Sequence, residues 1–306
     1  MTEIELINKL TLGLPADETV VTGPGDDCAV LQIADQTLLF KTDAIVEGVH
    51  FREDAAPEQI GHKALARPLS DIAAMGGVPT HALITLGINK DIKQDYIEAV
   101  YTGLRSCAAQ YGVNIVGGET TTLPHLTLSV SLLGTVKNPI MRSGSKIGDA
   151  IFVIGELGGS IAEHHLNFTP RITESRWLTD SFEIHAMIDL SDGLASDLRH
   201  LLTMHNGAEI LTSALPIRRI ARELAQQNPS SKTALLAALT DGEDYELLFT
   251  VSPKDAVSVL DCWKERFPDI SLKCIGKIID QPGIHLRDEN GTKPLTLHGY
   301  DHLQKS

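Results

Sequence analysis

The chain has 306 residues, of which 42% are hydrophobic and 22% charged, a balance typical of folded proteins rather than disordered ones. At about 150 residues per domain, this length predicts two domains. Asp and Glu outnumber Lys and Arg by 40 to 26, which gives a formal net charge of −14. A negative charge of this size argues against nonspecific binding of nucleic acid.

The chain carries no apolar run long enough for a membrane span, and residues 1–5 lack the basic and apolar regions of a secretory leader. We therefore expect a cytoplasmic protein without a membrane partner. The four cysteines stand far apart, without a C-x-x-C pair, so their spacing predicts buried free thiols rather than a zinc site or a disulfide framework. They are Cys28, Cys107, Cys262 and Cys274.

The first half of the chain alternates strand and helix patterns. Short β-branched or alternating runs bounded by Gly, Pro or Asp predict strands, and apolar residues at helical spacing predict helices. The predicted strands are 38–42, 80–88 and 126–136, and the predicted helices are 57–75 and 92–111. This half therefore predicts one mixed α/β domain.

A polar, Gly-rich stretch at 142–149 predicts a domain boundary, with domains at 1–141 and 142–306. The same patterns resume after it. The predicted strands are 150–154, 186–190, 246–251 and 272–279, and the predicted helices are a segment after Gly159 and residues 194–204. The second half therefore predicts another α/β domain.

Five small acidic clusters beside Gly, Ser or Thr are the most informative pattern: 25–27, 42–43, 70–71, 117–120 and 189–193. Carboxylate oxygens at strand ends and loops are the ligands that Mg²⁺ takes, often together with substrate phosphate oxygens. Each cluster by itself is also compatible with a helix cap, as for Asp71 or Asp189. The five together favour a shared metal site, provided that the fold brings them together.

Other motifs carry weaker signals. The Gly-rich segment 155–160 is neither a Rossmann nor a Walker sequence and favours an ordinary turn. The pair His164 and His165 favours solvent-facing side chains. His50 follows an acidic cluster, and the sequence leaves open whether it contacts a substrate or makes a structural hydrogen bond. No signature of a Ser or Cys nucleophile occurs, so covalent catalysis is not indicated.

In order and spacing, the clusters resemble the thiamine-monophosphate kinase family, in the superfamily of aminoimidazole ribonucleotide synthetase. The resemblance covers nearly the whole chain. Its carriers are 25–31 (GDDCAVL), 42–51 (TDAIVEGVHF), 69–76 (LSDIAAMG), 117–121 (GGETT), 142–144 (RSG), 188–194 (IDLSDGL), 242–247 (GEDYEL) and 299–302 (GYDH).

The resemblance implies two α/β domains, with the N-terminal sheet pairing across a homodimer. It implies ATP-dependent phosphorylation of thiamine monophosphate to thiamine diphosphate, with Mg²⁺ between the nucleotide and the substrate phosphate. The transfer would be direct and in line, without a catalytic side chain, because the substrate phosphate is already an anionic nucleophile.

The resemblance also carries over residue by residue. The matched metal positions are Asp27, Thr42, Asp43, Asp71, Glu119, Asp189 and Asp192. The matched nucleotide positions are Gly118, Glu119, Arg142, Ser191 and Tyr101. His50 and Glu243 match positions that contact the thiamine moiety or its phosphate, and Leu297 stands where the family often has a stacking aromatic residue.

The chain departs from the family pattern at four places, one of which is a shorter stretch from residue 159 to 170. Glu119 replaces the usual Asp, Leu297 replaces the aromatic residue, and Pro68 replaces the usual Asn, which predicts a local bend and disfavours α conformation before it. Two alternatives stay open: a related ATP-dependent synthetase, and a non-catalytic protein that binds nucleotide or thiamine diphosphate.

Overall fold

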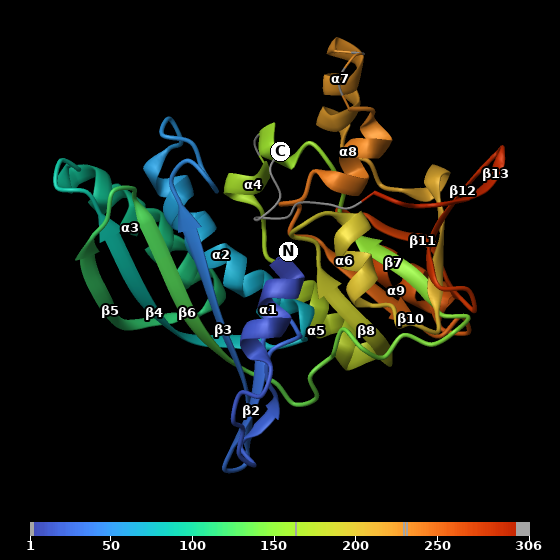
Figure 1. Cartoon of the computed structure of the whole chain (residues 1–306), viewed down its shortest axis with the longest axis horizontal. Coiled ribbons are helices and arrows are strands. Elements are labelled where there is room, and N and C mark those ends of the chain that lie inside the picture. The colour runs from blue at the N-terminus through green and yellow to red at the C-terminus, as the bar shows by residue number, and fades with distance from the viewer. Residues whose placement is uncertain (1–2, 163, 229, 231, 298–306) are drawn as a thin grey trace. The chain divides into compact units, whose positions relative to one another are not determined.

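The chain divides into two units, each built on one sheet, in a computed structural model that describes residues 3–162, 164–228, 230 and 232–297 (Figure 1). The six-stranded unit comprises Glu18–Pro139 together with residues 163–176. The seven-stranded unit comprises Met1–Asp17, Ile140–Ala162 and Trp177–Ser306. The prediction of two mixed α/β units is therefore confirmed, whereas the boundary after residue 141 stays a prediction about folding domains.

The sheet of the six-stranded unit has the order β1-β2-β3-β6-β4-β5. Only the β4–β5 pair is parallel. In chain order the elements are β1 (Val20–Thr22), β2 (Ala29–Ile33), β3 (Gln36–Val46), α2 (Pro57–Ala74), β4 (Val78–Ile88), α3 (Gln94–Tyr111), β5 (Asn114–Thr122), β6 (Thr127–Thr135) and α4 (His164–Asn167), followed by the first half of α5 (Ile172–Ser181).

Helices α2 and α3 pack against each other and cover one face of this sheet (Figure 1). Alternate residues of β3, β4 and β6, such as Leu39, Ile84 and Val130, are buried against that layer because strand side chains alternate between faces. The opposite face carries Phe40 and Leu83, whose exposed fractions are 44% and 50%. The open face thus carries exposed apolar side chains among Ser and Thr residues such as Ser131, and helices of its own unit cover only the other face.

The sheet of the seven-stranded unit has the order β13-β12-β9-β11-β7-β10-β8. Its strands are β7 (Ala150–Ile154), β8 (Ile184–Asp189), β9 (Gly207–Leu211), β10 (Leu247–Val251), β11 (Leu272–Ile279), β12 (Gly283–Asp288) and β13 (Gly291–Pro294). The helical segments are α1 (Glu3–Thr11), η1 (Ser160–Ala162), the second half of α5, α6 (Leu194–His200), η2 (Thr212–Ala214), α7 (Arg219–Gln227), α8 (Ala234–Thr240) and α9 (Ala256–Arg266).

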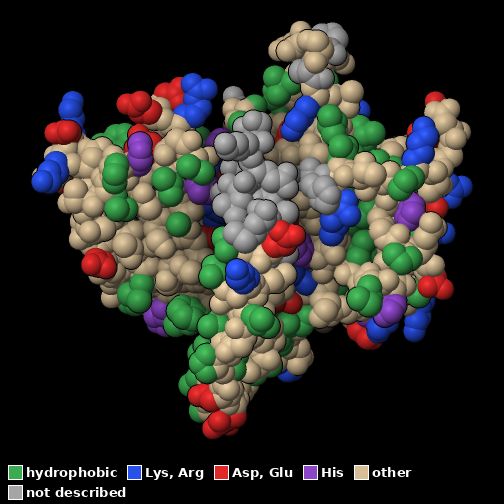
Figure 2. All heavy atoms as spheres, in the orientation of Figure 1, with side chains coloured by type: hydrophobic (Ala, Val, Ile, Leu, Met, Phe, Trp, Pro, Cys, Tyr) green, Lys and Arg blue, Asp and Glu red, His purple; other side chains and the backbone are tan. Residues whose placement is uncertain are grey.

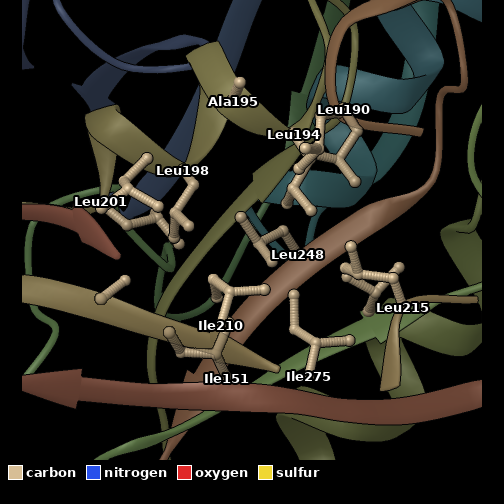
Figure 3. Close-up of a cluster of buried hydrophobic side chains, with 14 of the residues drawn as sticks. Ile151, Leu190, Leu194, Ala195, Leu198, Leu201, Ile210, Leu215, Leu248 and Ile275 are labelled. Atoms are coloured by element: carbon tan, nitrogen blue, oxygen red, sulfur yellow. The ribbon is translucent and has the colours of Figure 1, made fainter. Parts of the chain in front are cut away.

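The core of this unit lies between the sheet and its helices, where Ile151, Leu248 and Ile275 of the central strands meet Leu194 and Leu198 of α6 (Figure 3). Every residue of β7 and β10 is buried, as expected for strands covered on both faces. Strand β8, next to β10 in the sheet, ends at the acidic loop described below, and the turn that carries Glu243 leads into β10. The core thereby fixes the backbone from which those turns leave.

Most predicted elements are present, with shifts of a few residues at their ends. Two expectations are wrong. The helix predicted over 194–204 ends at His200, and Arg67 is helical although α conformation is disfavoured before Pro68. Helix α2 thus confirms the helix predicted over 57–75, although Pro68 has no N–H to donate to the carbonyl one turn earlier, and the bend expected there stays a prediction. Burial of almost the whole second half of α2 compensates for that missing hydrogen bond. Among the helices that the structure describes, none combines the length and apolar character needed to cross a membrane.

The thiol prediction is half right, because Cys28 and Cys107 are buried whereas Cys262 and Cys274 are exposed. The surface agrees with the charge count. Lys and Arg side chains are interspersed with Asp and Glu over the face shown in Figure 2 and do not merge into one large basic patch.

Candidate functional site

Strand β3 and helix α2 bring an acidic group together inside the six-stranded unit. Asp43 lies on β3 and Asp71 in the last turn of α2, where it is 6% exposed. Lys41 reaches both carboxylates: its Nζ lies 2.7 Å from Asp71 Oδ1 and 3.9 Å from Asp43 Oδ1. Because Asp71 is preceded by more than three turns of helix, the capping alternative for this cluster is wrong.

Asp27 joins this group from the turn before β2, where it is 1% exposed and its backbone N–H donates to Asp26 Oδ1. The neighbouring Cys28 is equally buried, and burial together with the negative charges of Asp71, Asp27 and Asp43 raises the pKa of its thiol well above the ordinary value. The thiol therefore stays protonated at neutral pH. The ionised groups around it are carboxylates and one ammonium group.

Two other predicted ligands of the same unit lie elsewhere on the sheet. Thr42 points to the face opposite Asp43, where its hydroxyl accepts a hydrogen bond from Ser131. Glu119 lies on the edge strand β5, in register with Thr85 of β4. Strands β4 and β6 separate it from β3, a distance of about 14 Å at about 4.8 Å per strand. Within this unit, the structure brings together Asp27, Asp43 and Asp71, but not Thr42 or Glu119.

The predicted nucleotide contacts Gly118 and Tyr101 are also separate from this group. Gly118 lies beside Glu119 on β5, so close to β4 that a Cβ atom there would fall 1.8 Å from the carbonyl oxygen of Ile84. Glycine at this position is therefore explained by strand packing. Tyr101 lies on α3, half-buried, and burial raises the pKa of its hydroxyl.

His50 closes a loop between β3 and α2. Its Nδ1 accepts a hydrogen bond from the backbone N–H of Val46, and its carbonyl oxygen accepts one from Lys63 Nζ at 2.6 Å. The structural alternative for His50 is therefore realised, and the structure leaves its contact with a substrate untested. Lys63 is fully buried and also lies 2.9 Å from Nδ1 of His165. The expectation that His165 faces solvent is wrong, because its ring packs against this buried ammonium group.

A second acidic loop connects β8 to α6 in the seven-stranded unit. Asp189 ends β8 and is buried, and Ser191 and Asp192 follow it before Gly193, the N-cap of α6. No side chain caps this helix, so the capping alternative is wrong here too. Instead, the backbone N–H of Asp192 donates to Asp197 Oδ2, one turn into α6.

Asp197 is a member of this loop that the sequence did not single out. It is 2% exposed, and burial, followed by the charges of Asp192 and Asp189, raises the pKa of its carboxyl well above the usual range. The positive charge of Arg142 acts in the opposite direction, so Arg142 lies within electrostatic reach of the loop. The helical pattern after Gly193 could have identified Asp197, because it predicts that residue 197 lies in the first turn of the helix, next to the loop 189–192.

The C-terminal segment contains the last predicted substrate residue. Leu297 is 44% exposed, and its carbonyl oxygen accepts a hydrogen bond from Arg199 on α6, as does that of Leu295. The sequence 299–302, which carries part of the family resemblance, lies outside the described residues.

The Gly-rich loop after β7 makes an ordinary turn, as favoured from its sequence. Its backbone N–H groups are occupied by carboxylates: Gly158 donates to Asp244 Oδ1 at 3.0 Å, and Gly159 donates to Asp241 Oδ2 at 2.9 Å. Glu243, beside Asp244, has a left-handed backbone, with φ 53°. The turn that holds this predicted substrate residue is therefore tied to the Gly-rich loop.

Comparison with known proteins agrees with this arrangement. Residues 25–136 match the family model described as "AIR synthase related protein, N-terminal domain", which assigns the six-stranded unit to that class of α/β protein. Over most of its length the chain is 38% identical to the thiamine-monophosphate kinase of Rhodopirellula baltica, covering 88% of this chain and 86% of the relative. It is 35% identical to the enzyme of Escherichia coli K12, covering 93% and 92%. The chain belongs to the thiamine-monophosphate kinase family.

Solved structures extend the similarity. The structure described as "AaThiL complexed with AMPPCP and TMP" is 30% identical, covers 98% of this chain and 96% of that chain, and gives a TM-score of 0.81. Thiamine-monophosphate kinase from Stenotrophomonas maltophilia K279a is 32% identical, with coverage of 92% and 95% and a TM-score of 0.73. The hydrogenase maturation protein HypE of E. coli, at 20% identity and a TM-score of 0.70, shares the fold alone.

Proposed function

We propose that this chain is an ATP-dependent thiamine-monophosphate kinase. An oxygen of the substrate phosphate attacks the γ-phosphorus of ATP, the bond to the β–γ bridging oxygen breaks, and ADP leaves as thiamine diphosphate forms. The observation that carries this proposal is the near full-length similarity to a structure that holds AMPPCP and TMP. Because the attacking phosphate is already an anion, no general base is required, and positioning and charge neutralisation supply the catalysis.

The donor chemistry of the acidic groups fits Mg²⁺. In each unit the groups are carboxylates, which are hard oxygen ligands, and the pKa of the one buried thiol among them is raised so that it does not compete as a thiolate. We propose Asp27, Asp43 and Asp71 as ligands from one unit and Asp189 and Asp192 from the other. When bound, Mg²⁺ would neutralise phosphate charge. Thr42 and Glu119 remain proposed metal ligands. Thr42 would bind through a backbone atom, because its side chain lies on the face opposite Asp43, and Glu119 would bind a metal at a separate position on the sheet.

The other predicted residues keep proposed roles toward the two substrates. Gly118, Glu119, Arg142, Ser191 and Tyr101 are proposed nucleotide contacts. Arg142 is a fixed positive charge near the Asp189–Asp192 loop and can orient a phosphate. His50, Glu243 and Leu297 are proposed contacts of thiamine monophosphate.

The test is to incubate the purified chain with Mg-ATP and thiamine monophosphate and to separate the products by chromatography. Thiamine and aminoimidazole ribonucleotide precursors serve as parallel substrates, and EDTA as the metal control. Thiamine diphosphate that forms only with Mg²⁺ supports the kinase. Product from a precursor instead would favour a related synthetase, and binding of both ligands without product would favour a non-catalytic binding protein.

We also propose that the chain acts as a cytoplasmic homodimer in which the open face of the six-stranded sheet pairs with a second copy. The support is the exposure of two large apolar side chains on that face, Phe40 and Leu83, which are each about half exposed. In sedimentation velocity the wild-type chain should be a dimer and Leu83→Glu a monomer. Leu12→Glu, on the other unit and 85% exposed, is the matched control. A wild-type monomer at micromolar concentration would contradict the proposal.

A further inference from the structure

The turn Gly242–Tyr245, directly before β10, has a backbone conformation that L residues rarely adopt. Glu243 and Tyr245 have φ angles of 53° and 49°, both in the left-handed region, and Gly242 precedes them at 71°. Such residues persist only where the surrounding contacts hold them, and they gather at functional sites. The contacts that hold this turn therefore bear on what Glu243 does.

One side of the turn is tied to the acidic loop after β8. The backbone N–H of Glu243 donates to the carbonyl oxygen of Ser191 at 2.6 Å, and that of Tyr245 donates to Leu190 at 2.8 Å. These bonds fix the two left-handed residues at their nitrogen atoms. They do not hold Asp244, the residue between these two, whose side chain is bound by other groups.

Asp244 fixes the other side of the turn through a fully buried carboxylate. Its Oδ1 accepts hydrogen bonds from Arg218 Nη1 at 2.8 Å and from Gly158 N at 3.0 Å, and the same Nη1 donates to Gly158 O at 3.1 Å. Burial raises the pKa of Asp244 to about 7, and Arg218 is the strongest opposing influence. Without Arg218, this carboxyl group would lose its hydrogen-bond donor at 2.8 Å and the positive charge that opposes the rise of its pKa.

We infer that Arg218 is a positioning residue for the substrate: through Asp244 it holds the Gly242–Tyr245 turn in the left-handed conformation that fixes Glu243. The inference rests on the proposed contact between Glu243 and thiamine monophosphate. It deepens that proposal, because Arg218 itself comes from the segment before α7 and has no proposed contact with either substrate. A buried ion pair often stabilises a fold no more than an apolar pair of similar size would. The Arg218–Asp244 pair is therefore better tested for its effect on substrate binding than for its effect on stability.

The test measures the dissociation constants of thiamine monophosphate and of an ATP analogue by calorimetry, on the full chain with Mg²⁺, with turnover measured in parallel. The variants are Arg218→Gln, Asp244→Asn, Glu243→Ala and the double variant Arg218→Gln/Glu243→Ala. Arg219→Gln is the matched control, because Arg219 is adjacent and its side chain is 89% exposed. Circular dichroism establishes which variants are folded. If Arg218→Gln does not fold, the conclusion is drawn from Asp244→Asn instead.

Arg218→Gln and Asp244→Asn should each weaken thiamine monophosphate binding by about tenfold, the size of one charge-assisted contact. Binding of the ATP analogue should stay within about twofold, as should both affinities in Arg219→Gln. The double variant should bind thiamine monophosphate no more weakly than Glu243→Ala, because both changes remove the same contact.

Three outcomes would overturn the inference: unchanged thiamine monophosphate affinity in folded Arg218→Gln and Asp244→Asn, an equal loss of affinity for both ligands, or additive losses in the double variant. A wild-type chain that binds thiamine monophosphate without turnover contradicts the proposed kinase activity but leaves this binding test intact. If Glu243→Ala alone has no effect, the proposed substrate contact fails and the inference fails with it.

Discussion

Lys41 forms an ion pair with Asp71 inside the six-stranded unit. This ion pair determines which substitution can test the acidic group without disturbing the fold. The Nζ atom of Lys41 lies 2.7 Å from Asp71 Oδ1 and 3.9 Å from Asp43 Oδ1, so one positive charge serves two partly buried carboxylates. Removal of one carboxylate charge therefore leaves Lys41 with its second partner, Asp43.

The Asp71→Asn variant should lower kcat by roughly 100-fold while the fold is retained. Asn keeps the shape and an oxygen that can accept the hydrogen bond from Lys41, but it removes the negative charge proposed to bind Mg²⁺. Steady-state kinetics with varied Mg²⁺ provide the measurement, and Asp35→Asn, on an exposed turn of the same unit, provides the control. A near-normal kcat in a folded Asp71→Asn protein would exclude Asp71 from the metal site.

The four thiols should separate into two classes in the native protein. Cys262 and Cys274 are exposed and should react with iodoacetamide, Cys274 more slowly because partial burial raises its pKa. Cys28 and Cys107 should stay unmodified, since they are buried and burial raises the pKa of Cys107 to about 12. Mass spectrometry after timed labelling gives the order, and labelling in guanidinium should reach all four. Early modification of Cys107 would contradict the packing of α3.

At the scale of single residues, the sequence indicates which residues belong to a site. It does not indicate which side chains they contact. Asp43 and Asp71 stand out as small acidic clusters, but their shared contact with Lys41 depends on a helix packing on a strand. The same limit applies to His165, because its partner Lys63 is about a hundred positions away in the chain. Side-chain pairs of this kind follow from tertiary packing, which local patterns do not encode.

Elements were predictable where one face is apolar and the other polar, or where a run is wholly apolar. Helix α3 and strand β7 are examples, and both have nearly the predicted bounds. Strand β5 was missed because nearly all of its residues are exposed and its last six residues, GGETTT, carry no apolar alternation. Its strand conformation is imposed by pairing with β4 instead.

The packing of α2 on α3 depends on two glycines and gives a prediction at this scale. A Cβ atom on Gly103 would lie 1.8 Å from the carbonyl oxygen of Glu58, and one on Gly61 would lie 1.8 Å from that of Val100. Gly103→Ala should therefore push the helices apart and lower the free energy of unfolding by about 2–3 kcal/mol, despite the better helix propensity of Ala.

Denaturant unfolding measures that change, with Ser106→Ala as the control on the exposed side of α3. The control should change the unfolding free energy by less than about 0.5 kcal/mol. If Gly103→Ala is as stable as the wild-type chain, the helices do not approach as closely as the two glycines imply.

The division of the whole molecule into units was only partly visible in the sequence. The Gly-rich stretch at 142–149 lies close to the point where the chain leaves the six-stranded unit, at Pro139. Nothing in the pattern indicates that residues 163–176 return to that unit, because their contribution is a set of contacts with α2 and α3. His165 contacts Lys63, Ser175 donates to the carbonyl of Ala73, and Phe168 is 1% exposed.

These contacts predict that residues 18–141 alone are an incomplete folding unit. Without the returning segment, the fully buried Lys63 loses its histidine partner and apolar surface around Phe168 is exposed, changes that cost several kcal/mol together. A fragment in which a Gly/Ser linker replaces residues 140–162 and joins 18–139 to 163–176 should therefore unfold cooperatively, at a denaturant midpoint well above that of 18–141. The matched control is the same linked fragment with Phe168→Ala and His165→Ala, which should unfold like 18–141. Equal midpoints for 18–141 and the linked fragment would mean that the returning segment only rests on a domain that folds without it, as the boundary after residue 141 implies.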